Sequence, residues 1–178
     1  MTVQTKHTDY KDAKEATSLD TWSAIDSHAT TGYTVSIDPT SASSNVLISV
    51  NCHIGIDTSN DGKYYGLRLY RKIGSNAWAE VTVARGNTGG TSDVHDTCWL
   101  ADNMGSAWNT NENNLITNLS GTFLDSPNTT STVLYTLYWK SKLGTSGQGD
   151  GSIYLNQVKH ETATYQPRLI SSITAQEI

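Results

Sequence analysis

The strongest constraint on this chain is a two-residue alternation of bulky apolar side chains in two segments. The first segment, residues 132–140, carries them at every second position: Val133, Tyr135, Leu137 and Trp139. The second segment, residues 45–55, repeats the pattern with Val46, Ile48, Val50, Cys52 and Ile54. A two-residue period puts alternate side chains on one face of a β-strand, whereas a helix needs a period of 3.6. Both segments are therefore predicted to be strands with one buried face.

Other short strand-like runs follow one another, separated by turn residues. They span residues 33–37, 63–72, 78–84, 115–123, 152–156 and 169–178. Proline lacks the backbone N–H that a ladder needs, so Asp-Ser-Pro-Asn at residues 125–128 predicts a corner. Repeated short strands with turns between them indicate a sandwich or barrel. We expect eight to ten strands and no helix, with the last strand paired near the middle of a sheet.

Composition supports one polar β-domain. A chain of 178 residues is the length of a single domain or of a domain with an arm. Only 36% of the residues are apolar, but nine tyrosines and five tryptophans are more than a disordered chain carries. Residues 31–178 are predicted to form a β-sandwich domain, and residues 1–30 an N-terminal arm and first strand.

A long polar, glycine-rich segment, residues 86–118, interrupts the strand pattern. We expect one strand inside it, from Val94 to Leu100. Loops of this length are uncommon in compact domains and are often functional or form interfaces.

The charge balance argues against two classes of partner. The formal net charge is −5, whereas nucleic acids and anionic membranes attract basic surfaces. We therefore predict no nucleic-acid and no membrane partner. The N-terminus, MTVQTKHTDYKDAKEA, has no apolar stretch typical of a secretory signal, so synthesis and folding in a cytoplasm are expected.

The residues that carry chemistry are scattered. No Gly-x-Ser-x-Gly nucleophile motif is present, and Asp93 with His95 supplies only two ligands where a metal site needs more. We expect no catalytic residue, metal or cofactor, and we interpret His95 as a polar interface residue. Cys52 and Cys98 are interpreted as two thiols, and a disulfide between them stays open.

The five tryptophans fall into two groups. Three lie in or beside strand-like segments and are expected to fill the core: Trp22, Trp78 and Trp139. Trp99 and Trp108 lie in the long polar segment, where a tryptophan is as well suited to anchor an interface or stack on a sugar.

Five segments, taken in order, resemble one family of proteins. Ile37 to Ile48 is similar to the family's I-x-P-T-S-x-S-S-K-I-L-I segment, and Leu69 to Arg71 to its L-x-R strand end. Phe123 to Ser131 resembles an F-L-D-S-P-x-T-T-S corner. Ile153 to Asn156 resembles x-Y-L-N, and Leu169 to Ile178 matches a C-terminal S-S-I-T-x-x-E-I. The family comprises tail-fibre and virion-surface proteins of marine tailed bacteriophages, including cyanophages.

The resemblance covers the chain from about Thr30 to its end. It implies a jelly-roll-like antiparallel β-sandwich, similar to C1q and TNF-type modules, that assembles as a homotrimer without catalytic residues. The chain departs from the family at Asn45, where lysine is usual, and in the insertion at residues 86–118.

Three functional hypotheses follow. The first is a trimeric capsid decoration (cement or knob) protein of the virion, assembled in the host bacterial cytoplasm, because the chain is short and lacks coiled-coil heptads for a shaft. Its partners would be other copies and the major capsid or tail proteins, with Val3, His7 and Tyr10 as candidate anchoring residues. The second is a tail-fibre or receptor-binding tip in which His95, Trp99 and Trp108 meet a host-surface glycan. The third, a secreted lectin or glycan-active enzyme, lacks a signal peptide and an acid/base pair.

Overall fold

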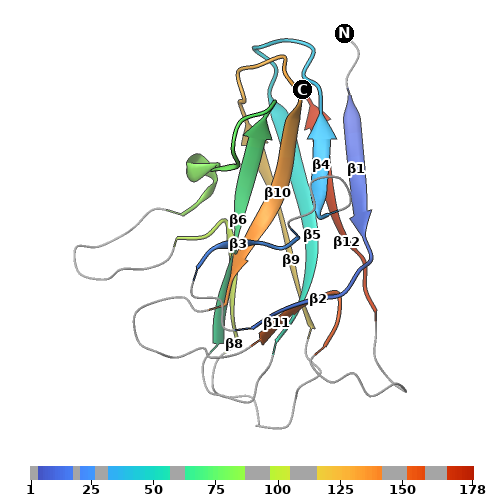
Figure 1. Cartoon of the computed structure of the whole chain (residues 1–178), viewed down its shortest axis with the longest axis vertical. Coiled ribbons are helices and arrows are strands. Elements are labelled where there is room, and N and C mark those ends of the chain that lie inside the picture. The colour runs from blue at the N-terminus through green and yellow to red at the C-terminus, as the bar shows by residue number, and fades with distance from the viewer. Residues whose placement is uncertain are drawn as a thin grey trace, which may run out of the picture.

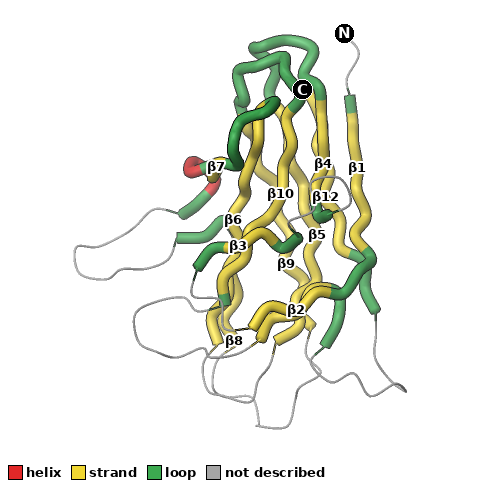
Figure 2. Tube along the Cα trace, viewed as in Figure 1, coloured by secondary structure: helices red, strands yellow, loops and turns green. Residues whose placement is uncertain are grey.

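The computed structural model is a two-layer, all-β structure (Figure 1). It describes residues 4–17, 21–26, 32–56, 63–86, 97–104, 116–141, 152–158 and 168–178. These residues form twelve strands and a single 3-10 turn, η1 (Thr82–Ala84), so nearly all of the regular structure is strand (Figure 2). The prediction of an all-β chain built from antiparallel sheets is confirmed, and the described strands outnumber the eight to ten expected.

Sheet A is organised around its longest strand, β5 (Val46–Ile56). β9 (Ile116–Asp125) pairs along one side of β5. On the other side β5 pairs first with β12 (Ser171–Glu177) and then with β11 (Ser152–Leu155). β1 (Thr5–Tyr10) pairs with β12, and β2 (Lys14–Thr17) pairs with β11. The last strand thus lies between two neighbours, as predicted.

Sheet B is organised around the pair of β6 (Lys63–Ile73) and β10 (Val133–Lys140). β10 also pairs with β4 (Thr34–Ile37) and with β3 (Ser23–Ala24). β6 also pairs with β7 (Ala79–Glu80) and with β8 (Leu100–Met104). All of these pairings are antiparallel.

The core lies between the two sheets. It contains the alternating apolar side chains that the sequence pattern predicted to be buried. All nine alternating residues of β5 and β10 are buried, and Tyr65, Leu67 and Leu69 of β6 join them. Ile173 and Ala175 of β12 and Tyr33 and Val35 beside and within β4 complete the centre. The two-residue period therefore predicted the packing as well as the strands.

The N-terminal region, expected to be an arm and a first strand, contributes paired strands to sheet A. Residues 5–10 pair with β12 at every position, and residues 14–17 pair with β11. No apolar alternation marks β1, because Thr5, His7 and Asp9 face outward, and Lys6 and Thr8 face the rim of the sandwich. The segment belongs to sheet A. Because it is a polar edge strand, its sequence lacks the apolar alternation that identifies a buried strand.

Two predicted strands have different bounds. In residues 78–84 only Ala79 and Glu80 are strand, and η1 follows because Val81 and Ala84 turn inward at a three-residue spacing. The strand predicted from Val94 to Leu100 starts only at Leu100, and residues 87–96 lie outside the described part of the chain.

Asn156 is the least expected of the buried polar residues. It follows β11 in the left-handed backbone region, at φ 59, and is fully buried. Its side-chain amide donates to the carbonyls of Tyr10 (2.7 Å) and Asp12 (3.2 Å), and its Oδ1 accepts from Ser171 Oγ (2.6 Å). One side chain therefore ties the end of β1 to the start of β12.

Replacing Asn156 with alanine is expected to destabilise the fold by about 2–4 kcal/mol. Alanine tolerates a positive φ poorly, and the change leaves buried partners without a hydrogen bond. Chemical denaturation measures the loss. Asn128→Ala is the control, since Asn128 has a similar φ of 53 but is exposed, and it is expected to lose only the smaller backbone contribution. Equal losses in the two variants would contradict the role of the buried amide.

Stability is expected to fall steeply above about pH 9. Burial raises the pKa of Tyr10, Tyr33 and Tyr135 above the ordinary 10.0, and raises that of Cys52 from 9.0 to about 12. These raised pKa values favour the neutral form in the folded state. Their contribution to stability is complete below the unfolded pKa values and is lost progressively as the pH rises from the unfolded values to the folded ones. Each group then removes about 1.4 kcal/mol per pH unit.

The measurement is urea denaturation at several values between pH 7 and 11. Tyr33→Phe keeps the buried ring but removes the ionisable proton, so its alkaline slope should be shallower than that of the wild type. It also loses the hydrogen bond to the carbonyl of Ser172 (2.7 Å), so its stability at pH 7 should be about 1 kcal/mol lower. Identical slopes would show that Tyr33 does not titrate with unfolding.

Candidate functional site

One end of the sandwich is built from segments that are far apart in the sequence. We call residues 38–45, 125–132 and 177–178 the closed end; it lies beside the C-terminus at the top of Figure 1. Glu177 accepts from the backbone N–H (2.7 Å) and the hydroxyl (2.6 Å) of Thr40. Asn45 and Ile178 exchange two backbone hydrogen bonds (3.2 and 2.9 Å). Ser126 Oγ donates to Asn45 Oδ1 (2.6 Å), so three of the five segments that carry the family resemblance meet here.

The corner at residues 125–128 is held through its first residue. Nη1 of Arg71 in β6 donates to both carboxylate oxygens of Asp125, at 2.5 and 2.7 Å. The hydroxyl of Tyr135 in β10 donates to the same carboxylate at 2.8 Å. Asp125 ends β9, so this buried cluster joins sheet A to sheet B.

The candidate contact residues differ in how exposed they are and in whether the structure describes them. Val3, His95 and Trp108 lie outside the described residues. Trp99 is half-buried and packs edge-to-face against Phe123, with ring centroids 6.4 Å apart. Tyr10 is buried and donates to Asp26 Oδ2 (2.7 Å), whereas His7 is exposed on the outer face of sheet A. Of the candidates that the structure describes, only His7 is freely exposed to a partner.

Trp22 has a role that the sequence did not predict. Trp139 fills the core as expected, but Trp22 and Trp78 are only half-buried. The guanidinium of Arg68 lies 4.1 Å from the ring centroid of Trp22 and also donates to the carbonyl of Thr97 (2.8 Å) and to Glu80 Oε2 (3.2 Å). Arg68 thus clamps two chain segments onto the outer face of sheet B. Its use in these contacts indicates a structural role.

A hydroxyl, an imidazole and a carboxylate lie in line on the outer face of sheet A. His7 Nδ1 is 2.7 Å from Thr174 Oγ1, and His7 Nε2 is 2.8 Å from Asp9 Oδ1. This order matches a nucleophile, a base and an orienting acid. Acyl transfer also needs N–H donors aimed at an oxyanion. β12 is paired on both sides, so its ladder uses those amides, and we interpret the three residues as a surface hydrogen-bond chain.

The part of the outer face of sheet A that β5, β9 and β12 form carries no formally charged side chain. Eleven side chains of β5, β9 and β12 point outward there: Leu47, Ser49, Asn51, His53, Asn118, Ser120, Thr122, Leu124, Ser172, Thr174 and Gln176. None is Asp, Glu, Lys or Arg, although roughly three would be expected of a typical exposed surface. Depletion of charge is a mark of the centre of protein interfaces.

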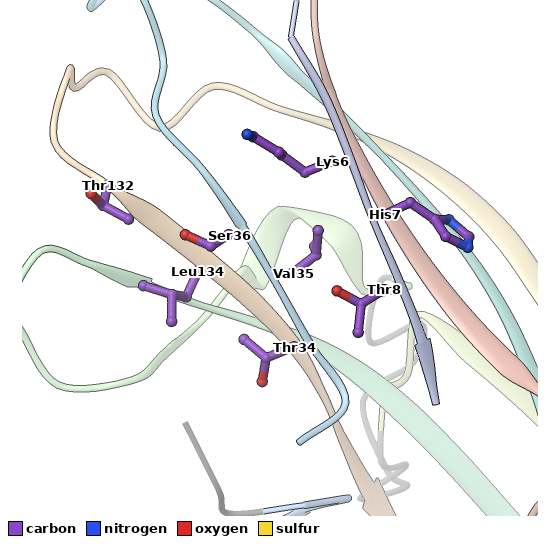
Figure 3. A pocket seen from close by; sticks show the side chains of 8 residues that line it. All are labelled: Lys6, His7, Thr8, Thr34, Val35, Ser36, Thr132 and Leu134. Atoms are coloured by element: carbon purple, nitrogen blue, oxygen red, sulfur yellow. The ribbon is translucent and has the colours of Figure 1, made fainter. Parts of the chain in front are cut away.

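A groove opens where β1, the edge of sheet A, approaches β4 of sheet B (Figure 3). Its volume is about 540 Å³, and its lining is Lys6, His7, Thr8, Thr34, Val35, Ser36, Thr132 and Leu134. Lys6 and Thr8 extend toward β4, whereas the ring of His7 extends away (Figure 3).

Cys52 and Cys98 are not joined by a disulfide. Within the described residues, no three His, Cys, Asp or Glu side chains gather closely enough to hold a metal ion. Nor is any helix in this part of the chain long and apolar enough to cross a membrane. Comparison with protein-family models found no match, and comparison with curated proteins found none either.

Proposed function

We propose that this chain is a non-enzymatic structural protein on the surface of a bacteriophage virion. The observation that carries the proposal is the closed end. Unrelated chance matches would scatter over a fold, but three of the resembling segments lie side by side and share hydrogen bonds. This adjacency supports reading the resembling segments as parts of one structural unit.

We further propose that the sandwich is a jelly roll. In a jelly roll of eight strands, a folded ribbon pairs the first strand with the eighth, the second with the seventh, the third with the sixth and the fourth with the fifth. Taking β1, β4, β5, β6, β8, β9, β10 and β12 as the eight, the pairs are β1–β12, β4–β10, β5–β9 and β6–β8. They alternate between sheets A and B, which supports this topology.

We also propose a homotrimer in which the outer face of sheet A lies against neighbouring copies. Most side chains of this face are short, since they are serine, threonine or asparagine, so another copy can approach the backbone closely. Leu47 pairs with Leu124 at one end and adds apolar area. Four of the nine polar side chains already have hydrogen-bond partners, as Asn118 donates to Asn51 at 2.5 Å, and the other five would bond across the interface to the neighbouring copy.

Capsid decoration is the role that we put first, and deletion of the gene tests it. Particles without the protein should assemble with normal heads but lose infectivity faster on heating and osmotic shock, because a cement protein adds contacts between capsid subunits. Survival curves of deleted and complemented phage give the measurement. Loss of adsorption with unchanged head stability would contradict decoration and favour a tail-tip role.

A further inference from the structure

We propose that the groove between β1 and β4 binds a saccharide. Its volume of about 540 Å³ lies within the range of roughly 300–1,000 Å³ that small-ligand sites occupy. It is formed by three strands: Lys6 and Thr8 come from β1, Thr34 and Ser36 from β4, and Leu134 from β10. Such a groove lies away from the sheet A face that the trimer would cover.

The side chains of the groove match a polyhydroxylated ligand. Thr8, Thr34, Ser36 and Thr132 offer hydroxyl groups, each of which both donates and accepts hydrogen bonds. Thr132 Oγ1 donates to Asp38 Oδ1 (2.6 Å), which leaves its lone pairs as acceptors for a sugar hydroxyl. Leu134 provides an aliphatic surface for the C–H groups of a sugar ring.

Lys6 is the charged group of the groove. Its ammonium has three donors, and no carboxylate of the described residues forms an ion pair with it. None of the eight lining residues is acidic or carries sulfur, so hard cations and soft metals both lack ligands here. No lining side chain offers an aromatic ring on which a nucleobase would stack, because the ring of His7 is turned toward Thr174 and Asp9.

The groove is held in shape before any ligand arrives. β1 is paired with β12 at six positions and β4 with β10 at four. The side chain of Gln4 bridges the two strands by donating to the carbonyl of Asp38 at 2.8 Å. A rigid site loses little conformational entropy on binding, which favours affinity for a flexible oligosaccharide.

A competing explanation is that the charge of Lys6 prevents a strand of another molecule from pairing with the edge of sheet A. Lysine is common on edge strands for this reason. The two explanations differ in their consequences. Protection of the edge requires only a charge, so the Lys6→Glu variant would keep that protection. A saccharide site requires hydrogen-bond donors at this position, so both Lys6→Ala and Lys6→Glu would weaken binding.

The test is a titration of the ¹⁵N-labelled chain with neutral and uronate-bearing oligosaccharides, followed by amide NMR shifts. We expect saturable shifts centred on Thr8, Thr34 and Ser36, whichever of the two sugar classes binds. Lys6→Ala and Lys6→Glu should weaken binding about tenfold or more, and Ser36→Tyr should abolish it by filling the groove. Lys11→Ala, an exposed lysine outside the groove, should bind like the wild type.

The proposal is overturned if no saccharide of either class shifts these amides, or if binding survives in both Lys6 variants and in Ser36→Tyr. Lys6 and Ser36 are exposed, so unchanged thermal unfolding of the variants would show that lost binding is not lost folding. The experiment uses the isolated chain. A negative result therefore leaves the virion role intact, and absence from virions would leave the groove intact.

Discussion

Replacing Arg71 with methionine should destabilise the folded chain by about 3 kcal/mol. The side chain of Asp125 is only 3% exposed, so removing its cation leaves a buried carboxylate without charge compensation. Breaking such a pair typically costs about 3–5 kcal/mol, and the 28% exposure of Arg71 places the expected loss at the lower end. The midpoint of thermal unfolding should fall by roughly 6–12 °C.

Arg85→Met is the matched control. Arg85 is more exposed, at 38%, and its Nη1 lies 3.6 Å from Glu80, so less than about 1 kcal/mol should be lost. Adding Asp125→Asn to Arg71→Met removes the uncompensated charge and should restore part of the stability. If Arg71→Met loses no more than Arg85→Met, the buried cluster does not hold the two sheets together.

The second large effect concerns assembly. The wild-type chain of 19.3 kDa should form a trimer of about 58 kDa, three times that mass, at micromolar concentration. Thr122→Lys should convert it to a monomer, because three like charges would be buried without partners at the interface. Thr122 is exposed on the outer face of sheet A, so the fold of the monomer should be unchanged.

Mass photometry and native mass spectrometry measure this change. Thr130→Lys is the control, since it adds the same charge at an exposed threonine of the closed end and should leave the trimer intact. A wild-type monomer would contradict the trimer. A trimer that tolerates Thr122→Lys but not Thr130→Lys would move the interface from sheet A to the closed end.

The sequence predicted the central strands of this fold better than its edge strands. β5 and β10 each have one buried face. Side chains that point to that face must be apolar, so apolar residues occur at every second position of these strands. β1, β2 and β3 lie at sheet edges, where short pairings and polar faces leave no such period. Their pairing depends on β12, β11 and β10, which lie far away in the chain.

The sites were harder to predict for the same reason. The sequence marks Asp125 only as a turn residue, because its partner Arg71 lies 54 residues away. Asn156 lies at the end of a segment that the sequence predicts to be a strand. Its contacts with Tyr10 and Asp12, however, join residues more than a hundred positions apart. The groove combines Lys6, Ser36 and Thr132, none of which belongs to a local motif. The predicted contact residues were chosen by their place in the N-terminal arm and in the long polar segment, and place in the sequence does not determine where a side chain points.

The most direct test of the proposed virion role is the copy number of this chain in purified particles of a phage whose genome encodes it. Quantitative mass spectrometry against an isotope-labelled standard, normalised to the major capsid protein, gives that number. A capsid decoration protein should be present in hundreds of copies per particle, in a fixed ratio to the capsid protein. Tens of copies or fewer would place the chain in the tail, and its absence from purified particles would contradict a structural role in the virion.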